Sequence, residues 1–197
     1  MTAPLVLVSR LTARDGAEAR SRADAVLRER LGELLGRAAA TIEISRVCEH
    51  CGDERHGRPF VVDAGDVSFS VSHSDRFAVV AVAATNARLG VDIEVLRPRP
   101  RLEQLAARVL NPSELDGFFA ADAAMRLERF LRAWTTKEAY LKATGVGIAT
   151  NLRAVSVPDS GWTVHAIDAP GSYIGCVVAQ GDLDVDARSI ASDAPVA

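Results

Sequence analysis

The sequence predicts an α+β fold made of two similar halves in a pseudo-twofold arrangement, each a small, largely antiparallel sheet packed with helices. In each half, helical periodicity is followed by short segments of strand character, and the proline-rich segment RPRPR at 97–101 separates the halves. Each proline restricts the preceding residue and lacks a backbone N–H, so regular structure should stop there. We therefore predict an N-terminal half, residues 1–97, and a C-terminal half, residues 98–197, with a flexible tail after about residue 182.

The first half begins with a predicted strand. The residues MTAPLVLVSRL contain an apolar run too short for a membrane span and without the basic start of a signal peptide. An amphipathic helix should follow from Ala17 to Leu35, with leucines on one stripe and arginines opposite. Five segments of strand character come next, separated by turn-forming residues: TIEISRV, FVVD, VSFSVSH, FAVVAVAA and LGVDIEV.

The second half repeats this order loosely. Helical patterns span about 101–110, 112–120 and 123–143, and three strand-like segments follow: LRAVSV, WTVHAI and YIGCVVA. No sequence repeat relates the two halves residue by residue. The pseudo-twofold arrangement is therefore predicted from their similar order of helices and strands.

Composition narrows the function classes. A chain of 197 residues with 48% hydrophobic content can bury the core of a globular enzyme. The net charge of -3 lacks the basic surplus of a sequence-independent nucleic-acid binder. Three cysteines, an odd number, favour free thiols in a reducing compartment. We expect a cytoplasmic, monomeric protein without nucleic-acid or membrane partners.

One carboxylate interrupts a hydrophobic pattern. Within RLERFLRAWTTKEAYLK, large apolar residues recur at alternating spacings of four and three, and Glu138 falls on their stripe. A buried carboxylate without a partner costs several kcal/mol, so something must compensate its charge. An ion pair with Lys142, one turn further along, is the simpler explanation, and a bound cation is the other.

A second acidic feature favours a bound cation over an ion pair with Lys142. In GVDIE, Asp92 and Glu94 alternate on an apolar strand, so their side chains leave the same face roughly 7 Å apart. Solvated residues at a strand end would explain them equally well. Together with Glu138, however, they supply three oxygen donors of the kind that Mg²⁺ prefers when it also binds substrate phosphates.

Three segments in this order resemble the surfactin-synthetase-activating class of 4'-phosphopantetheinyl transferases: VSFSVSHSDRFAVVAVA, LGVDIE and WTTKEAYLKATGVGI. The family pattern is a Ser-His pair after a strand, then G-[IV]-D-[IV]-E, then W-[ST]-x-K-E-[AS]-x-x-K, and all three are present. The resemblance is strong over roughly residues 57–150 and weak in the N-terminal helix. It implies a Mg²⁺-dependent enzyme that moves the 4'-phosphopantetheine arm of coenzyme A onto a serine of an apo acyl or peptidyl carrier protein, releasing 3',5'-ADP.

The resemblance also assigns roles by position. It implies that Asp92, Glu94 and Glu138 are the Mg²⁺ ligands, and that Lys142 contacts the pantetheine-bearing phosphate. It further implies that coenzyme A phosphates are held by Ser72, His73 and Arg58, the arginine of HGRP.

Two assignments remain open. The basic residue for the 3'-phosphate is Arg20 or Arg22, and we select Arg22. The general base for the carrier serine is Glu138 or Glu114. In NPSE, however, Asn111 is a ready helix N-cap and Glu114 stands where a capping box needs it. We therefore favour Glu138 as the base, with Glu138, Lys142 and His73 as the catalytic group.

The segment CEHCGDERH has metal-like spacing at Cys48, Cys51 and His56. A structural zinc site needs a fourth ligand, and His50 lies inside the CxxC itself, which makes simultaneous ligation awkward. The resemblance places this stretch in a loop before HGRP. A zinc site is therefore the less favoured interpretation.

Two other readings compete with the transferase. A Mg²⁺-dependent phosphohydrolase acting on nucleotide-like substrates could share the three carboxylates. A non-catalytic module that binds coenzyme A or carrier proteins would have lost its metal ligands, and here none is missing. The sequence does not identify the carrier, but Arg97, Arg99 and Arg101 form a basic segment that could contact an acidic one.

Overall fold

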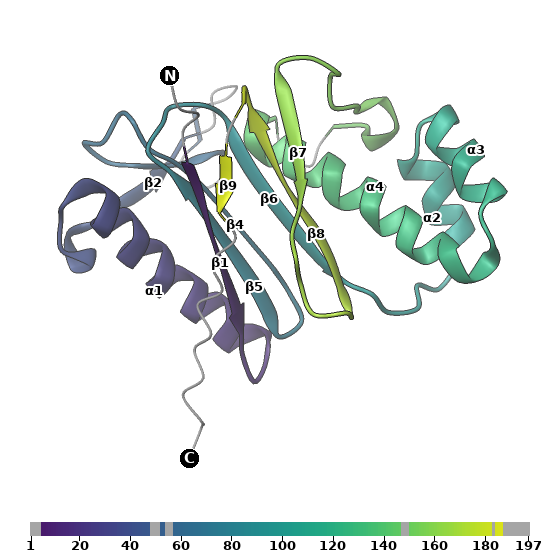
Figure 1. The fold of residues 1–197 in the computed structure, drawn as a ribbon, viewed down its shortest axis with the longest axis horizontal. Helices are drawn as coiled ribbons and strands as arrows, with labels where there is room; N and C mark the ends of the chain where they lie inside the picture. The colour runs from purple at the N-terminus through teal and green to yellow at the C-terminus, as the bar shows by residue number, and fades with distance from the viewer. Residues whose placement is uncertain (1–4, 48–51, 54–56, 147–149, 183, 187–197) are drawn as a thin grey trace.

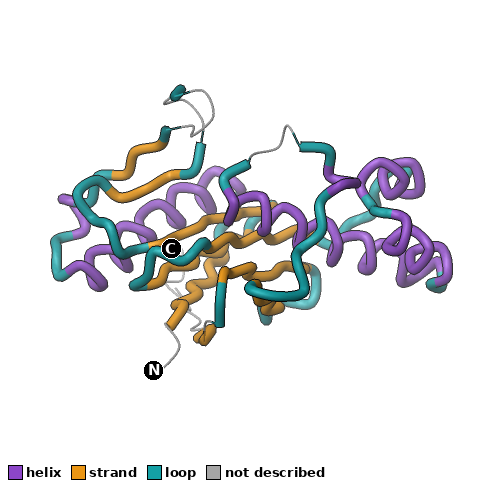
Figure 2. The backbone as a smooth tube through the Cα atoms, turned by 90° about the horizontal axis from the view of Figure 1, so that it is seen from above, coloured by secondary structure: helices purple, strands orange, loops and turns teal. Residues whose placement is uncertain are grey.

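The structure, a computed structural model, describes residues 5–47, 52–53, 57–146, 150–182 and 184–186. It confirms the α+β class: two main antiparallel-rich sheets lie in the middle, with helices on both flanks (Figures 1 and 2). No helix among these residues is both long and apolar enough to span a membrane.

The first sheet has the strand order β4-β5-β1-β9. β5 lies between β4 and β1 and is antiparallel to both, while β9 adds to β1 in parallel. The bounds are β1 (Leu5–Thr12), β4 (Ser68–Ser74), β5 (Phe77–Ala83) and β9 (Asp184–Asp186). The last strand lies within the predicted tail and was not expected.

Helix α1 (Gly16–Leu35) covers one face of this first sheet. Asp15 caps its N-terminus by accepting hydrogen bonds from two backbone N–H groups, and Gly36 ends it in a left-handed conformation. Its buried stripe is made of Ala19, Ala23, Leu27 and Leu31, which recur every four residues. A short hairpin of β2 (Ile44–Arg46) and β3 (Pro59–Val61) adjoins this unit.

The second sheet has the order β6-β8-β7 and is antiparallel. It consists of β6 (Leu89–Val95), β7 (Trp162–Ala166) and β8 (Tyr173–Gln180). One face of β6 and β8 joins the first sheet in a shared core that includes Val79, Val91 and Val177. β6 precedes the predicted boundary at residue 97 and pairs beyond it, and β9 returns to β1. The two predicted halves therefore exchange strands, and their division into domains remains a proposal.

Helix α4 (Ala123–Thr144) lies on the other face of β6 and β8, and α2 (Leu102–Val109) and α3 (Pro112–Ala120) pack beside it. Gly90 makes this approach possible. A Cβ atom at Gly90 would lie 1.9 Å from the carbonyl oxygen of Ala139. The glycine of GVDIE therefore brings the backbone of β6 directly against α4, next to Glu138.

The predicted strand LRAVSV is wrong. Residues Leu152–Ala154 form a 3-10 turn, η2, and the following residues are irregular. The carbonyl oxygens of Leu152 and Val155 instead accept hydrogen bonds from the ammonium group of Lys137. The backbone carbonyls of this segment thus bind the buried side chain of Lys137 instead of a neighbouring strand. The alternating apolar pattern of the segment does not indicate this.

Candidate functional site

Two carboxylates project from β6 toward α4. The odd-numbered residues of β6 enter the shared core, so Asp92 and Glu94 face the opposite way, as the alternation of a strand requires. Asp92 is only 6% exposed. Its Oδ1 accepts hydrogen bonds from Ser72 Oγ and Lys142 Nζ, both at 2.8 Å. Its Oδ2 is buried and has no hydrogen-bond partner among the described residues.

Glu94 has a different set of partners. Its Oε2 accepts hydrogen bonds from Ser74 Oγ at 3.2 Å and from Arg99 at 2.7 Å. Arg99, the middle arginine of the RPRPR segment, is therefore half-buried in an ion pair at the edge of the acidic group. Arg97 and Arg101 stay exposed.

Glu138 comes from α4 and completes the acidic group. It is 9% exposed, so its predicted burial on the apolar stripe is confirmed. No hydrogen bond or ion pair joins its carboxylate to another described residue. Lys142 does not pair with Glu138. Its ammonium group turns to β6 and donates to the carbonyl of Val91 and to Asp92.

Burial and mutual repulsion raise the pKa of two of these acids. The pKa of Asp92 is raised chiefly by burial and further by the charge of Glu94, against the opposing effect of Lys142. Burial likewise raises the pKa of Glu138, and the charge of Asp92 adds to it. The surroundings of both acids therefore favour the protonated form, despite the opposing charge of Lys142.

The described residues contain no group of three or more His, Cys, Asp or Glu side chains already arranged as a metal site. Lys142 and Arg99 occupy oxygen atoms of Asp92 and Glu94. The chemistry of the group nevertheless fits a hard divalent cation, which prefers carboxylate oxygens and keeps positions for water and phosphate. Among the described residues, Asp92 Oδ2, Glu94 Oε1 and the carboxylate of Glu138 are the oxygen donors left for it.

His73 and two arginines of α1 lie on the side of the first sheet. His73 follows Ser72 on β4, and Arg20 of α1 lies 3.3 Å from its Nε2. The pKa of His73 is lowered, first by burial and then by the charges of Arg20 and Lys142. Arg22, which we selected from the sequence, donates to the carbonyl of Thr12. The structure thus brings Arg20 beside His73.

Arg58 lies at the other end of β4. One of its N–H groups donates to Ser68 Oγ at 3.2 Å, and a Cβ atom at Gly145, the C-cap of α4, would be 3.5 Å from its own Cβ. The arginine therefore stands next to the C-terminal end of α4, which also carries Lys142. Cys48, Cys51, His50 and His56 lie outside the described residues.

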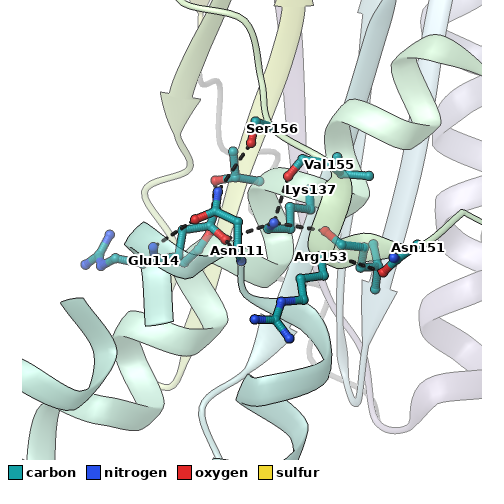
Figure 3. A network of polar contacts seen from close by, with 10 residues as sticks. Asn111, Glu114, Lys137, Asn151, Arg153, Val155 and Ser156 are labelled. Atoms are coloured by element: carbon teal, nitrogen blue, oxygen red, sulfur yellow. Dashed lines mark hydrogen bonds and ion pairs between the residues drawn. The ribbon is translucent and has the colours of Figure 1, made fainter. Parts of the chain in front are cut away.

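A second charged cluster lies beside Glu138 on α4 (Figure 3). Lys137 is 2% exposed, and its ammonium group has three acceptors. It donates to the carbonyls of Leu152 and Val155 at 2.9 Å and 2.7 Å and lies 2.8 Å from Glu114 Oε2. Three acceptors satisfy all three N–H bonds of an ammonium group. The sequence pattern does not indicate this cluster, because the partners of Lys137 lie in α3 and in the segment predicted as a strand.

The capping role of Glu114 is confirmed. Asn111 Oδ1 accepts from the N–H of Glu114, and Glu114 Oε2 accepts from the N–H of Asn111, both at close to hydrogen-bond optimum. With Lys137 as a further partner, Glu114 is held within the second cluster (Figure 3).

Comparison with known proteins gives one consistent result. Residues 88–183 match the model of the 4'-phosphopantetheinyl transferase superfamily. The chain is 35% identical over 121 residues to the putative 4'-phosphopantetheinyl transferase slr0495 of Synechocystis sp., covering 55% of this chain and 49% of the relative. It is 37% identical over 127 residues to the 4'-phosphopantetheinyl transferase HetI of Nostoc sp., covering 63% of this chain and 50% of the relative.

A 4'-phosphopantetheinyl transferase of Bacillus subtilis is 28% identical over 158 residues, which is 78% of this chain and 68% of the relative. The chain spans about half the length of the Synechocystis and Nostoc relatives. The matched residues include β6, α4 and β8, and with them Asp92, Glu94, Glu138 and Lys142. Through these residues the chain is similar to members of the 4'-phosphopantetheinyl transferase superfamily.

Proposed function

We propose that this protein transfers the 4'-phosphopantetheine group of coenzyme A to a serine of an apo acyl or peptidyl carrier protein, releasing 3',5'-ADP in a Mg²⁺-dependent reaction. The observation that carries the proposal is the incompletely compensated group of acids between β6 and α4, inside the region that matches the superfamily. A buried carboxylate oxygen without a partner is costly, and a bound cation would remove that cost.

In this proposal Asp92, Glu94 and Glu138 hold Mg²⁺. When bound, the ion neutralises charge on the pyrophosphate of coenzyme A and stabilises the departing phosphate. Carboxylates from a rigid strand and a long helix suit this task, because Gly90 fixes the distance between the two elements.

The basic residues around the acids would bind the phosphates. Lys142 of α4 pairs with Asp92, Arg58 lies beside the C-terminal end of α4, and His73 of β4 lies beside Arg20 of α1. Arg22, two residues after Arg20 on α1, remains our candidate for the 3'-phosphate. Phosphoryl transfer depends largely on such positioning and charge compensation.

Glu138 is our candidate for the general base that removes the proton of the carrier serine. Its raised pKa brings it toward the range in which a carboxylate accepts a proton effectively near neutral pH. Glu114 is the weaker candidate, because the capping box and Lys137 already use its carboxylate. We further propose a cytoplasmic monomer. The free, buried thiol of Cys176 is consistent with a reducing compartment.

Intact mass spectrometry tests the proposal. Incubation with coenzyme A, Mg²⁺ and an apo carrier protein should add about 340 Da to the carrier, the mass of one phosphopantetheine joined through a single phosphoryl group. No mass gain with several different carriers would refute it. Release of inorganic phosphate from nucleotides without a carrier would instead support the phosphohydrolase.

A further inference from the structure

The two main sheets meet along a row of serine side chains. β4 is an edge strand of the first sheet and β6 an edge strand of the second, and no backbone ladder joins them. The outward N–H groups of an edge strand lack strand partners. Here the N–H groups of Val91 and Val95 donate to Ser70 Oγ and Ser74 Oγ at 3.0 Å, and that of Ile93 donates to Ser72 Oγ at 3.3 Å. We call Ser70, Ser72 and Ser74 the serine row.

Two members of the serine row make the same pair of contacts. Ser72 donates to Asp92 Oδ1 and accepts from the N–H of the next residue, Ile93. Ser74 donates to Glu94 Oε2 and accepts from the N–H of Val95. The spacing of two residues on β4 matches the spacing of two residues on β6. Each serine therefore fixes one carboxylate relative to the backbone that carries it.

The third member makes only half of this pair. Ser70 accepts from the N–H of Val91 at the same distance as Ser74 does from Val95, but the residue that would face its proton is Gly90, which has no side chain. Ser70 thus contributes to the contact between the sheets without touching an acid.

We propose that Ser72 and Ser74 are positioning residues, which hold the carboxylates of Asp92 and Glu94 in the orientation that binds the cation. For Ser72 this role replaces the phosphate contact that the family resemblance implies. This inference rests on the proposed function, because it assigns the serines a task in the same site. It adds residues of β4 to a site otherwise built from β6 and α4.

The hydrogen-bonding capacity of a hydroxyl group supports this role. A serine has one proton to donate, and in Ser72 that proton goes to Asp92 at 2.8 Å. None is left for a phosphate oxygen, which accepts but cannot donate when ionised. Ser72 is also 6% exposed, whereas His73, the next residue, is exposed on the other side of the strand. Residues behind metal ligands commonly fix their orientation in this way.

The test compares Ser72→Ala and Ser74→Ala with the matched control Ser70→Ala. Two affinities are measured in each full-length variant: that for Mn²⁺ in the presence of coenzyme A, by the electron paramagnetic resonance signal of free Mn²⁺, and that for coenzyme A in EDTA, by calorimetry. Thermal unfolding reports the contribution of each serine to the contact between the sheets. If Ser72→Ala does not fold, the comparison of Ser74→Ala with Ser74→Thr, which keeps the hydroxyl group, provides the test.

We expect Ser72→Ala to weaken Mn²⁺ binding by about tenfold or more and to leave the affinity for coenzyme A in EDTA within about twofold of wild type. Ser74→Ala should have a smaller effect, because Arg99 still holds Glu94, and Ser74→Thr should restore it. Ser70→Ala should lower the melting temperature without weakening Mn²⁺ binding.

Three outcomes would overturn the inference. The first is a loss of coenzyme A affinity in EDTA with unchanged Mn²⁺ binding by Ser72→Ala, which would make the serine a phosphate ligand. The second is equal loss of Mn²⁺ binding in Ser70→Ala and Ser72→Ala, which would mean general damage to the contact. The third is wild-type Mn²⁺ binding by both Ser72→Ala and Ser74→Ala. If the wild type neither binds Mn²⁺ nor modifies a carrier, the proposed function fails as well, whereas an active wild type with indifferent serines refutes only the positioning role.

Discussion

Helix α4 buries two neighbouring charged residues in opposite ways. Lys137 meets three acceptors, which satisfy its ammonium group completely. Glu138 has no hydrogen-bonding partner among the described residues and lies near Asp92, whose Oδ2 is also unpartnered. Buried charges are tolerated when they are paired and hydrogen-bonded. The comparison indicates that Lys137 belongs to the architecture, whereas Glu138 belongs to a site that a ligand completes.

The largest expected effect comes from Glu138→Gln, which keeps the shape of the side chain and removes its charge. Loss of a cation ligand and candidate base should lower the rate of carrier modification by about 100-fold or more. The melting temperature in EDTA should not fall, because the variant removes an uncompensated buried charge. The measurement is the initial rate of mass gain of the carrier, and wild-type turnover would contradict the assignment.

Lys137→Met removes the buried, fully hydrogen-bonded charge of α4. Methionine fills similar space but leaves two backbone carbonyls and part of Glu114 without their donor, so the free energy of unfolding should fall by about 2 to 3 kcal/mol. Turnover per folded molecule should stay within a few-fold of wild type. Denaturant unfolding measures the loss.

Arg132→Met is the matched control on the same helix. Its ion pair with Glu128 is exposed, with 60% of the arginine side chain accessible. Such pairs contribute about 0.5 kcal/mol or less. A loss as small for Lys137→Met would show that its three contacts do not stabilise the fold.

The pH dependence of stability sharpens the contrast. The pKa of Glu138 is raised above its ordinary value of 4.5, so in the pH range between the two values the folded protein holds a proton that the unfolded chain has released. Lowering the pH through the raised pKa should therefore increase the contribution of Glu138 to stability. That gain is complete below 4.5.

Glu138→Gln has no titratable group at this position. In EDTA, its advantage in melting temperature over wild type should accordingly be greatest near neutral pH and should shrink as the pH falls toward 4.5. An advantage that stays constant or grows on acidification would show that Glu138 is not held in an unfavourable charged state.

The smallest expected effect concerns the carrier. Arg97 and Arg101 are exposed, whereas Arg99 is engaged by Glu94. Reversing the charge of Arg97 and Arg101 together should raise the KM for an acidic carrier several-fold and more so at low salt, with the KM for coenzyme A unchanged. Unaltered carrier KM at low salt would exclude this segment as a docking surface.

The sequence predicts local structure well, because helices and strands leave their periodicity in neighbouring residues. The helix around Glu138 and the alternation of Asp92 and Glu94 are examples, and the burial of Glu138 follows from its stripe alone. The failure at LRAVSV has the opposite cause. Its backbone is used by Lys137, which is 15 residues from Leu152 along the chain.

Contacts between distant segments were not predictable in the same way. The partner of Lys142 is Asp92 rather than the nearer Glu138, and the serine row faces β6 across the boundary between the two sheets. The spacing of Ser70, Ser72 and Ser74 is visible in the sequence, but its match with Asp92 and Glu94 depends on how β4 and β6 lie side by side. Matching alternations of polar residues on two strands can therefore indicate which strands lie side by side.

The Mg²⁺ dependence of thermal stability tests the central claim most directly. Coenzyme A is present throughout, and the melting temperatures of wild type, Lys137→Met and Glu138→Gln are compared in EDTA and in saturating Mg²⁺. A ligand that binds only the folded state at 100 times its Kd stabilises it by about 2.7 kcal/mol. We predict that Mg²⁺ raises the melting temperature of wild type and Lys137→Met by several degrees and leaves that of Glu138→Gln unchanged. An equal increase in Glu138→Gln would contradict the claim that Glu138 helps to hold the cation.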